Sequence, residues 1–328
     1  MEIIKQTLSV CPTCIKEIPA TIIINNDGVI MHKTCSEHGP AEVLIERDPV
    51  FYMLCELQGC KEMYSGSFIC ITMKCNANCK YCYFPVDNAS VDRSIEDILK
   101  ECRTINRQPY MLTGGDPTMR DDLPELLTAI HKIGRVAFAT NGIKLADDKY
   151  LGRLLGSGMV HDGTADIGIS LHPEANNLHG EYSAKIQAIE NFVRRGVSMN
   201  LLFTIDKLSQ IDEYIDILDQ YRGTVWGGVI GIAAAAGCSK NVVDPIFISE
   251  AYYYLAEKAK REGKPFSFAT HGNSVASFTT IFDGYHIQLA KLRNKYDIDL
   301  DDLNCEPVAM CRDGRVVHSN YALVRHCS

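Results

Sequence analysis

Cysteine is the residue type in this sequence with the clearest capacity for chemistry, because it is abundant and unevenly placed. The chain has 328 residues and 14 cysteines, most of which fall in its first quarter. Clustered thiols form disulfides or bind metal ions. Residues 1–10 contain Lys5 and no apolar segment of a secretory signal, so we expect a reducing, cytoplasmic location in which disulfides are rare. The cysteines are therefore predicted to be metal ligands.

The most specific pattern is a C-x-x-x-C-x-x-C array formed by Cys75, Cys79 and Cys82, directly after the apolar run 68–73. Three thiolates in this spacing can bind three irons of one [4Fe-4S] cluster and leave the fourth iron open. A C-x-x-C redox or zinc pair at Cys79 and Cys82 is the alternative. The position of the array favours the cluster, because a strand passes into a loop there at an edge where sheets bind ligands.

A second candidate ligand-binding segment follows the next apolar run. It consists of Gly114, Gly115, Asp116, Pro117 and Thr118. Glycines let the backbone approach a ligand closely, and a carboxylate suits an ammonium group. A tight turn with Asp116 as a helix cap would explain the same residues without any ligand.

The elements that position these residues form a regular alternation of short apolar runs and amphipathic stretches. Six strands are predicted to begin at Phe68, Pro109, Arg135, Asp166, Val197 and Val225. Helices are expected between them, one starting with a capping box at Ser94 and another over Glu181–Arg195 ended by Gly196. Strands and helices on this period form a parallel sheet with its chemistry at the carboxyl ends. The period alone does not separate an incomplete barrel from an open, doubly wound sheet.

The cysteine array, with the aromatic Tyr81 just before its last cysteine, resembles the radical S-adenosylmethionine (SAM) superfamily over about residues 66–240. The resemblance implies an α/β fold, a partial (β/α)6 TIM-like barrel, in which the three cysteines and SAM hold one [4Fe-4S] cluster. It also implies reductive cleavage of SAM to a 5′-deoxyadenosyl radical that abstracts hydrogen from an unactivated carbon. Such an enzyme needs a one-electron donor such as ferredoxin or flavodoxin as a partner.

The same resemblance assigns cofactor contacts at the strand ends. The glycine segment looks like the family's G-G-E-P segment, which binds the methionyl amino group, with an aspartate in place of the usual glutamate. The implied contacts to SAM and the substrate cavity are Tyr81, Tyr83, Gly114, Gly115, Asp116, Pro117, Thr140, Asn141, Ser170 and His172. Gly228 and Gly231 of the sixth strand are expected near the adenine. Each of these segments is also ordinary turn chemistry, and His172 is equally well explained as a polar loop residue.

A second set of metal ligands precedes the predicted barrel and flanks a predicted hairpin at residues 21–31. These ligands are Cys11, Cys14, Cys35 and His38. Four such side chains can close a tetrahedral Zn²⁺ site, and a further cysteine in place of the histidine, Cys55 or Cys60, would suit iron. This pattern resembles the rubredoxin or zinc-ribbon-like module of a radical SAM branch that contains archaeal tetraether lipid synthases and pterin-methylating homologues.

That branch also has auxiliary iron-sulfur clusters. Four late cysteines can supply the ligands of one auxiliary [4Fe-4S] cluster. They are Cys238, Cys305, Cys311 and Cys327. The alternative is that Cys238 is a small core residue and the others are free thiols. Cys102 lies in a helical pattern and is predicted to belong to the core.

These patterns divide the chain into three parts: a metal-binding module over residues 1–65, the barrel over 66–262, and a C-terminal extension over 263–328. The extension is predicted to contain a strand at Phe266–Ala269 and a helix near Ile287–Lys295.

The composition narrows the function. The net charge of −8 argues against nucleic acid as a partner, and the longest apolar run, Val225–Cys238, is too short to cross a bilayer. We expect a radical SAM enzyme that forms a carbon-carbon bond on, or alkylates, a small molecule or lipid. A peptide- or protein-modifying radical SAM enzyme is the first alternative, and a non-catalytic iron-sulfur and zinc-ribbon electron carrier is a distant one.

Overall fold

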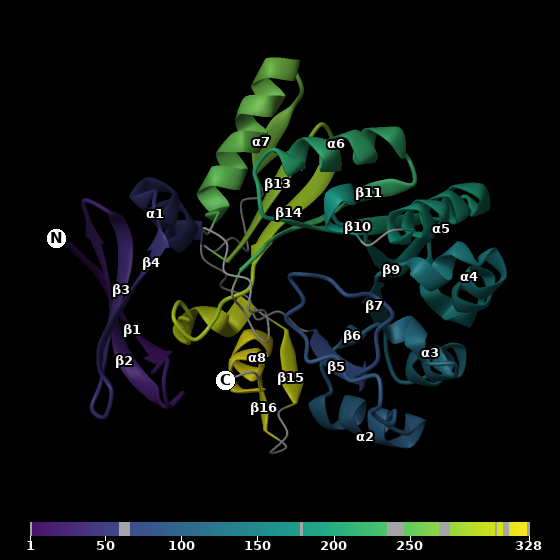
Figure 1. Cartoon of the computed structure of the whole chain (residues 1–328), viewed down its shortest axis with the longest axis horizontal. Coiled ribbons are helices and arrows are strands. Elements are labelled where there is room, and N and C mark those ends of the chain that lie inside the picture. Colours follow the sequence, from purple (N-terminus) through teal and green to yellow (C-terminus); the bar gives the residue numbers. More distant parts are fainter. Residues whose placement is uncertain are drawn as a thin grey trace.

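The computed structural model contains two β-sheets, each with its own core, and helices that pack on the larger sheet (Figure 1). It describes residues 2–58, 66–177, 180–234, 246–268, 276–305, 307–310 and 315–326. Among the described residues, no helix is long and apolar enough to span a membrane.

The smaller sheet is the N-terminal module, with four antiparallel strands in sequence order. It consists of β1 (Glu2–Val10), β2 (Glu17–Asn25), β3 (Gly28–Cys35) and β4 (Gly39–Glu46), followed by helix α1 (Pro49–Gln58). The predicted hairpin is confirmed as β2 and β3, which pair antiparallel up to Asn25 and Gly28. The metal-ligand pairs are therefore brought to one end of the module, because each pair stands at a strand end.

The larger sheet contains the six predicted strands, and all six are parallel. They are β5 (Ser67–Thr72), β6 (Tyr110–Gly114), β7 (Val136–Thr140), β9 (Thr164–Ser170), β10 (Ser198–Ile205) and β11 (Val225–Ile232). The two-residue strand β8 (Val160–His161) pairs with β9. This parallel sheet confirms the predicted partial barrel.

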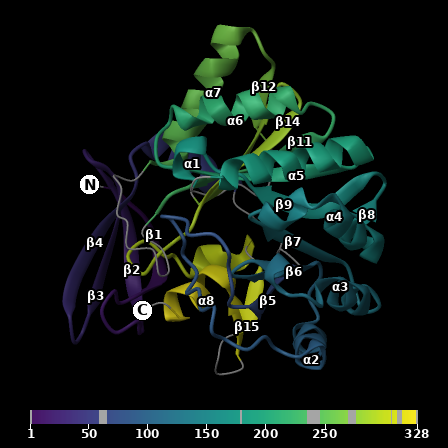
Figure 2. The same ribbon diagram turned by 45° about the vertical axis from the view of Figure 1, so that its right-hand side comes forward.

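Helices cover one face of this sheet (Figure 2). They are α2 (Ile95–Ile105), α3 (Leu123–His131), α4 (Asp148–Leu154), α5 (Glu181–Arg195), α6 (Gln210–Gln220) and α7 (Ile248–Glu262). Their boundaries follow the predicted caps: the Ser94 side chain accepts from the Asp97 backbone N–H, and Gly196 ends α5 at φ +63°. Apolar side chains that alternate along the strands, such as Ile69 and Ile71, pack with the helices into one buried core.

One prediction in the C-terminal region is wrong. The stretch near Ile287–Lys295 was expected to be helical, but β14 (Tyr285–Lys291) occupies most of it and pairs in parallel with β11. Its side chains alternate between buried and exposed, as in Ile287 and Gln288, which is the period of a strand. The sheet thereby gains a seventh parallel strand beside the six of the barrel.

Strands from the C-terminal region extend both edges of the larger sheet. On one side β13 (Ser277–Phe282) joins β14 and β12 (Phe266–Phe268), the latter at the position predicted for a strand. On the other side β15 (Val308–Met310) pairs in parallel with β5 and leads to β16 (Val316–His318) and helix α8 (Ser319–His326). In Figures 1 and 2, α8 lies between the module and β5.

Buried polar contacts fix the module against the C-terminal region. Lys33 is only 3% exposed, and its ammonium donates to the Ser9 hydroxyl at 3.0 Å and to the Tyr296 carbonyl at 2.7 Å. Lys5 forms ion pairs with Asp299 at 3.1 Å and Asp302 at 2.7 Å. A buried ammonium is costly unless it is paired, so these contacts hold the two regions in one arrangement.

Candidate functional site

The predicted cluster ligands lie on the loop between β5 and α2, which we call the cluster loop (residues 73–93). It leaves the carboxyl end of β5, and Cys75, Cys79 and Cys82 are all partly buried on it. The Ala77 backbone N–H donates to the Cys75 sulfur at 3.4 Å, and the Cys82 N–H donates to the Cys79 carbonyl at 3.1 Å. The loop thus turns tightly around its thiols at the edge of the sheet where ligands are expected.

The spacing of these thiols suits an iron-sulfur cluster, whereas burial of Cys75 and Cys79 disfavours the thiolate form that would bind iron. Burial raises the pKa of Cys79 to about 11, with repulsion from the neighbouring Cys82 and Cys75 thiolates adding to it. Among the described residues, three or more metal-type donors come within 4.8 Å of one another only in the N-terminal module. The three sulfurs of the cluster loop do not form such a close group.

The two glycines at the end of β6, Gly114 and Gly115, are required by the backbone at the start of the cluster loop. Gly115 N–H donates to the Thr72 carbonyl at 3.0 Å, and Asp116 N–H donates to the Lys74 carbonyl at 2.7 Å. A Cβ on Gly114 would lie 2.0 Å from the Thr72 oxygen, and one on Gly115 would lie 2.1 Å from the Lys74 oxygen. The sequence suggested that these glycines let the backbone approach a ligand. In the structure they let it approach the Thr72 and Lys74 carbonyls, at the start of the cluster loop.

The Asp116 carboxylate connects the ends of two strands. It is 2% exposed and caps the short 3₁₀ helix η1 (Pro117–Met119) by accepting from the Thr118 N–H at 2.9 Å. It also accepts from the Thr140 hydroxyl at 2.9 Å and from the Asn141 N–H at 2.6 Å. The capping alternative weighed for Asp116 is thus present in the structure, and both carboxylate oxygens already have protein donors.

Two aromatic residues of the cluster loop have different surroundings. The Tyr81 ring lies 4.7 Å from the Lys80 ammonium, which pairs with Asp206 beyond the end of β10 at 2.9 Å. Burial and contact with Asp206 raise the pKa of Tyr81 to about 12, so the phenol is neutral at physiological pH. Tyr83 is 39% exposed and leaves an aromatic surface open at the loop.

His172 is fixed to the neighbouring strand beyond the end of β9. It has φ +59°, and its Nδ1 accepts the Thr204 backbone N–H at 3.1 Å. Burial, with the nearby ammonium of Lys185, lowers the pKa of His172 to about 3. The imidazole is therefore neutral and presents Nε2–H. Ser170, two residues earlier, is partly buried and lies opposite Leu202 in the sheet.

Lys185 was not identified from the sequence, although it is fully buried beside the segment that follows β9. Its ammonium donates to Asn177 Oδ1 at 2.6 Å and to the Leu171 carbonyl at 3.4 Å. Its charge acts on the thiols of Cys79 and Cys75. A lysine in an amphipathic helix gives no sign of burial in sequence, so only the fold reveals this cation near the cluster ligands.

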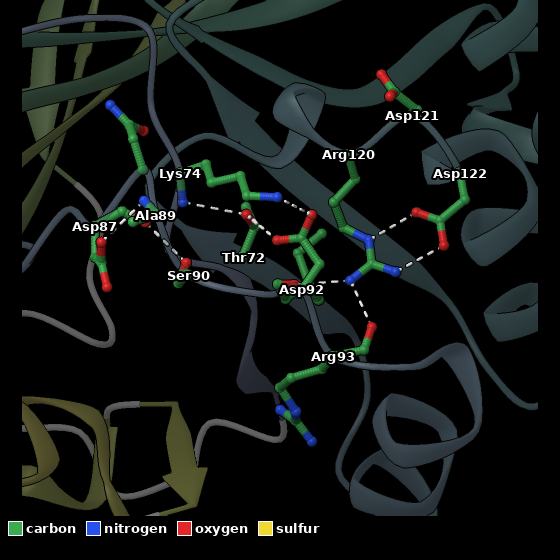
Figure 3. A network of polar contacts seen from close by, with 12 residues as sticks. Thr72, Lys74, Asp87, Ala89, Ser90, Asp92, Arg93, Arg120, Asp121 and Asp122 are labelled. Carbon is green, nitrogen blue, oxygen red and sulfur yellow. Dashed lines mark hydrogen bonds and ion pairs between the residues drawn. The ribbon is translucent and has the colours of Figure 1, made fainter.

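A carboxylate that the sequence analysis also missed holds the returning end of the cluster loop (Figure 3). Asp92 accepts from the Thr72 hydroxyl at 2.6 Å and from the Lys74 ammonium at 3.1 Å. The end of the loop is thereby tied to its beginning, one residue before the first cysteine.

Arg120 holds the same end of the loop from the opposite side, as Figure 3 also shows. It is 2% exposed and donates to the Ile71 carbonyl at 2.9 Å and to the Arg93 carbonyl at 2.8 Å. A bidentate pair with Asp122 at 2.8 and 2.9 Å fixes its guanidinium plane. The signal in the sequence was an arginine two residues after the glycine segment, with an acid two residues later.

The N-terminal module contains the predicted metal site. Its donor atoms, from Cys11, Cys14, Cys35 and His38, all lie within 4.8 Å of one another. The Cys14 and Cys35 sulfurs are 4.0 Å apart, and His38 Nδ1 lies 3.5 Å from the Cys35 sulfur. Burial opposes ionisation of Cys11, but hydrogen bonds from the Cys14 and Thr13 backbone lower its pKa to about 6. Three thiols and one imidazole at these distances fit a tetrahedral Zn²⁺ site.

The alternative fourth ligands do not join this group in the described structure. Cys55 is 2% exposed and packs in the barrel core beside Phe51, and Cys60 lies outside the described residues. Cys102 is fully buried in the same core, as predicted. Among the proposed auxiliary ligands, Cys238, Cys311 and Cys327 lie outside the described residues, and so does the side chain of Cys305.

Replacing Cys35 with serine is expected to remove one zinc per chain and to unfold the module. Structural zinc contributes an apparent 10–16 kcal/mol or so to small domains of this kind, more than the few apolar residues of this small core can replace. Metal analysis of protein purified without added iron, followed by limited proteolysis within residues 2–47, measures both effects. Cys55→Ala is the matched control and should keep its zinc; zinc retained by Cys35→Ser would contradict the assignment.

Comparisons with known proteins agree with the arrangement of module and barrel. Residues 69–220 match the model of the radical SAM superfamily, and residues 3–47 match that of the HMPTM N-terminal zinc ribbon domain. Over residues 69–220 the chain is therefore a radical SAM domain, and its metal-binding module, over residues 3–47, is a zinc ribbon. The fold is similar to that of SuiB from Streptococcus suis, with a TM-score of 0.51 at 10% identity over 91% of this chain and 81% of that one.

Two curated relatives match the chain in part. A 7,8-dihydro-6-hydroxymethylpterin dimethyltransferase from Methanocaldococcus jannaschii is 31% identical over 189 residues, which is 47% of this chain and 37% of that protein. An Fe-coproporphyrin III synthase from Methanosarcina barkeri is 26% identical over 161 residues, 46% of this chain and 40% of that protein. The chain thus covers well under half of the length of these relatives.

Proposed function

We propose that this chain reductively cleaves one SAM molecule and directs the resulting radical to a carbon atom of a small, polar heterocycle of the pterin type. A second SAM molecule would then supply the methyl group to that carbon and leave as S-adenosylhomocysteine, with a second electron from the same reduced donor. The observation that carries the proposal is the combination of a zinc ribbon of the HMPTM type with the C-x-x-x-C-x-x-C loop at the end of β5. The partial match to a hydroxymethylpterin dimethyltransferase supports the same substrate class.

The cofactors of this reaction would be held at the carboxyl ends of β5 to β7. Cys75, Cys79 and Cys82 would bind a [4Fe-4S] cluster, and the glycine segment after β6 lies beside them. When bound, the cluster supplies the electron that cleaves SAM to methionine and a 5′-deoxyadenosyl radical, which removes a hydrogen atom from the substrate. The electron would come from a ferredoxin or flavodoxin. Tyr81, Tyr83, Ser170 and His172 remain our candidates for contacts to SAM or substrate.

The face of the sheet away from the helices supports a polar substrate. Its side chains include Thr113, which lies opposite Cys70, and Asn200 and Thr204 on β10, all partly exposed. On β14, Gln288 is exposed and lies opposite Val229. Hydroxyl and amide groups can match the nitrogen and oxygen atoms of a heterocycle better than they can match a lipid chain. This favours a small heterocycle over a lipid.

The test begins with anaerobic reconstitution with iron and sulfide, followed by reduction with dithionite in the presence of SAM. We expect release of 5′-deoxyadenosine and, with 7,8-dihydro-6-hydroxymethylpterin and SAM labelled in its methyl group, a labelled pterin product detected by mass spectrometry. Release of 5′-deoxyadenosine with no labelled pterin would reject the substrate class. No 5′-deoxyadenosine from protein that holds its cluster would reject the reaction itself.

The runner-up is a radical SAM enzyme that modifies a peptide. It predicts that 5′-deoxyadenosine release rises when peptides are added and does not respond to pterins. Comparing these two additions under the same conditions separates the two substrate classes.

A further inference from the structure

We propose that Asn141 is a positioning residue that sets the reduction potential of the SAM-binding cluster by donating a hydrogen bond to the Cys75 sulfur. The proposal rests on the cluster of the proposed function, and it gives Asn141 a role toward the cluster in addition to, or instead of, a contact with SAM. The Asn141 amide nitrogen lies 3.9 Å from the Cys75 sulfur and 2.7 Å from Asn76 Oδ1. One side chain at the end of β7 therefore contacts the cluster ligand and its neighbour in the loop.

The orientation of the Asn141 amide follows from its other hydrogen bonds. Its oxygen accepts the Ile143 backbone N–H at 2.9 Å, so the NH₂ group must face the cluster loop. Its backbone N–H donates to the buried Asp116 carboxylate at 2.6 Å, and the residue is only 7% exposed. Asp116 thus holds the end of β7 in place, and the amide has little freedom to turn away from Cys75.

A hydrogen bond to a cluster thiolate affects the two oxidation states unequally. Reduction adds one negative charge to the cluster and its thiolates, so a donor at the sulfur stabilises the reduced state more than the oxidised state. The effect is stronger in a site shielded from water; Asn141 is buried and Cys75 is partly buried. The Asn141 amide is therefore expected to raise the reduction potential and to make reduction by the electron donor easier.

The test compares the midpoint potentials of reconstituted wild-type, Asn141→Ala and Asn141→Asp proteins by redox titration followed with electron paramagnetic resonance. We expect Asn141→Ala to lower the ratio of reduced to oxidised cluster about tenfold at a fixed potential, which corresponds to 59 mV for one electron. Asn141→Asp should lower it further, because a carboxylate would face the Cys75 thiolate. Both variants keep the backbone N–H that donates to Asp116.

Asp92→Asn is the matched control, because it loosens the other end of the cluster loop without removing any bond to a sulfur. Its clusters should keep the wild-type potential even if fewer chains hold one. Unchanged potentials in both Asn141 variants, or an equal shift in Asp92→Asn, would overturn the inference. A wild-type protein that shows no [4Fe-4S] signal would instead reject the proposed function.

Discussion

Replacing Cys79 with alanine is expected to abolish both the [4Fe-4S] cluster and the dithionite-driven release of 5′-deoxyadenosine. Cys79 is the middle ligand of the array. Without it only two thiolates remain, so two irons of the cluster, and not one, would lack a protein ligand. No other described cysteine is placed to replace it, since Cys70 on β5 directs its thiol toward the Thr72 carbonyl at 3.8 Å. The iron content should fall by about four per chain, and the product should fall to the level of a reaction without enzyme.

The control for this variant is Cys102→Ala. Cys102 is fully buried between α2 and the sheet, where it acts as a small apolar residue. We expect this variant to keep its iron and its product while losing some thermal stability. Full product release from Cys79→Ala would remove the central claim that the array holds the catalytic cluster.

Replacing Gly114 with alanine is expected to destabilise the barrel by more than about 4 kcal/mol, a large share of the 5–15 kcal/mol or so that holds a typical domain folded. Gly114 has φ +145°, which side chains rarely adopt, and a Cβ there would lie 2.0 Å from the Thr72 carbonyl oxygen. That oxygen accepts the Gly115 N–H, so the backbones of β5 and β6 cannot move apart without breaking this hydrogen bond. Urea unfolding measures the loss, and iron content after reconstitution reports on the cluster loop.

Two other glycines serve as controls that separate the steric clash of an added Cβ from the conformational cost of a positive φ. Gly156 is exposed, has no neighbour within 4 Å of an added Cβ and has no positive φ, so Gly156→Ala should change stability by less than about 0.5 kcal/mol. Gly196 has φ +63° and equally open surroundings, so Gly196→Ala should cost about 1–2 kcal/mol for conformation alone. If Gly114→Ala lowered the stability no more than Gly196→Ala does, the predicted clash with the Thr72 carbonyl would be contradicted.

The parts of this protein that could be predicted from its sequence are those encoded by neighbouring residues. The six strands, the caps at Ser94 and Gly196, and the hairpin of the zinc ribbon each depend on a local period or turn. The segment at β14 was wrongly predicted to be a helix, although its alternating pattern is that of a strand. Ile287 and Leu289 alternate with more exposed residues, and a parallel partner strand 59 residues earlier in the chain, β11, makes that segment a strand.

The cysteine array and the zinc ligands were also accessible from the sequence, because metal ligands on one short loop or at the two ends of one hairpin are brought together by local geometry. The spacing of the array by itself indicated a cluster with three protein ligands. The identity of the four zinc-ribbon ligands was decided by the fold, which puts Cys55 in the barrel core and His38 beside Cys11 and Cys35.

Only the tertiary structure decided what surrounds the cluster ligands. Asp116 and Asn141 looked like ligand contacts in sequence, and the fold joins them to each other and to Cys75. The burial of the cations Lys185, on α5, and Arg120, directly after η1, became visible only in the folded chain. The reason is physical: carboxyl ends of neighbouring parallel strands meet in space although helices separate them in sequence. The sequence thus determined which residues are candidate metal ligands, and the tertiary contacts determined which residues surround them.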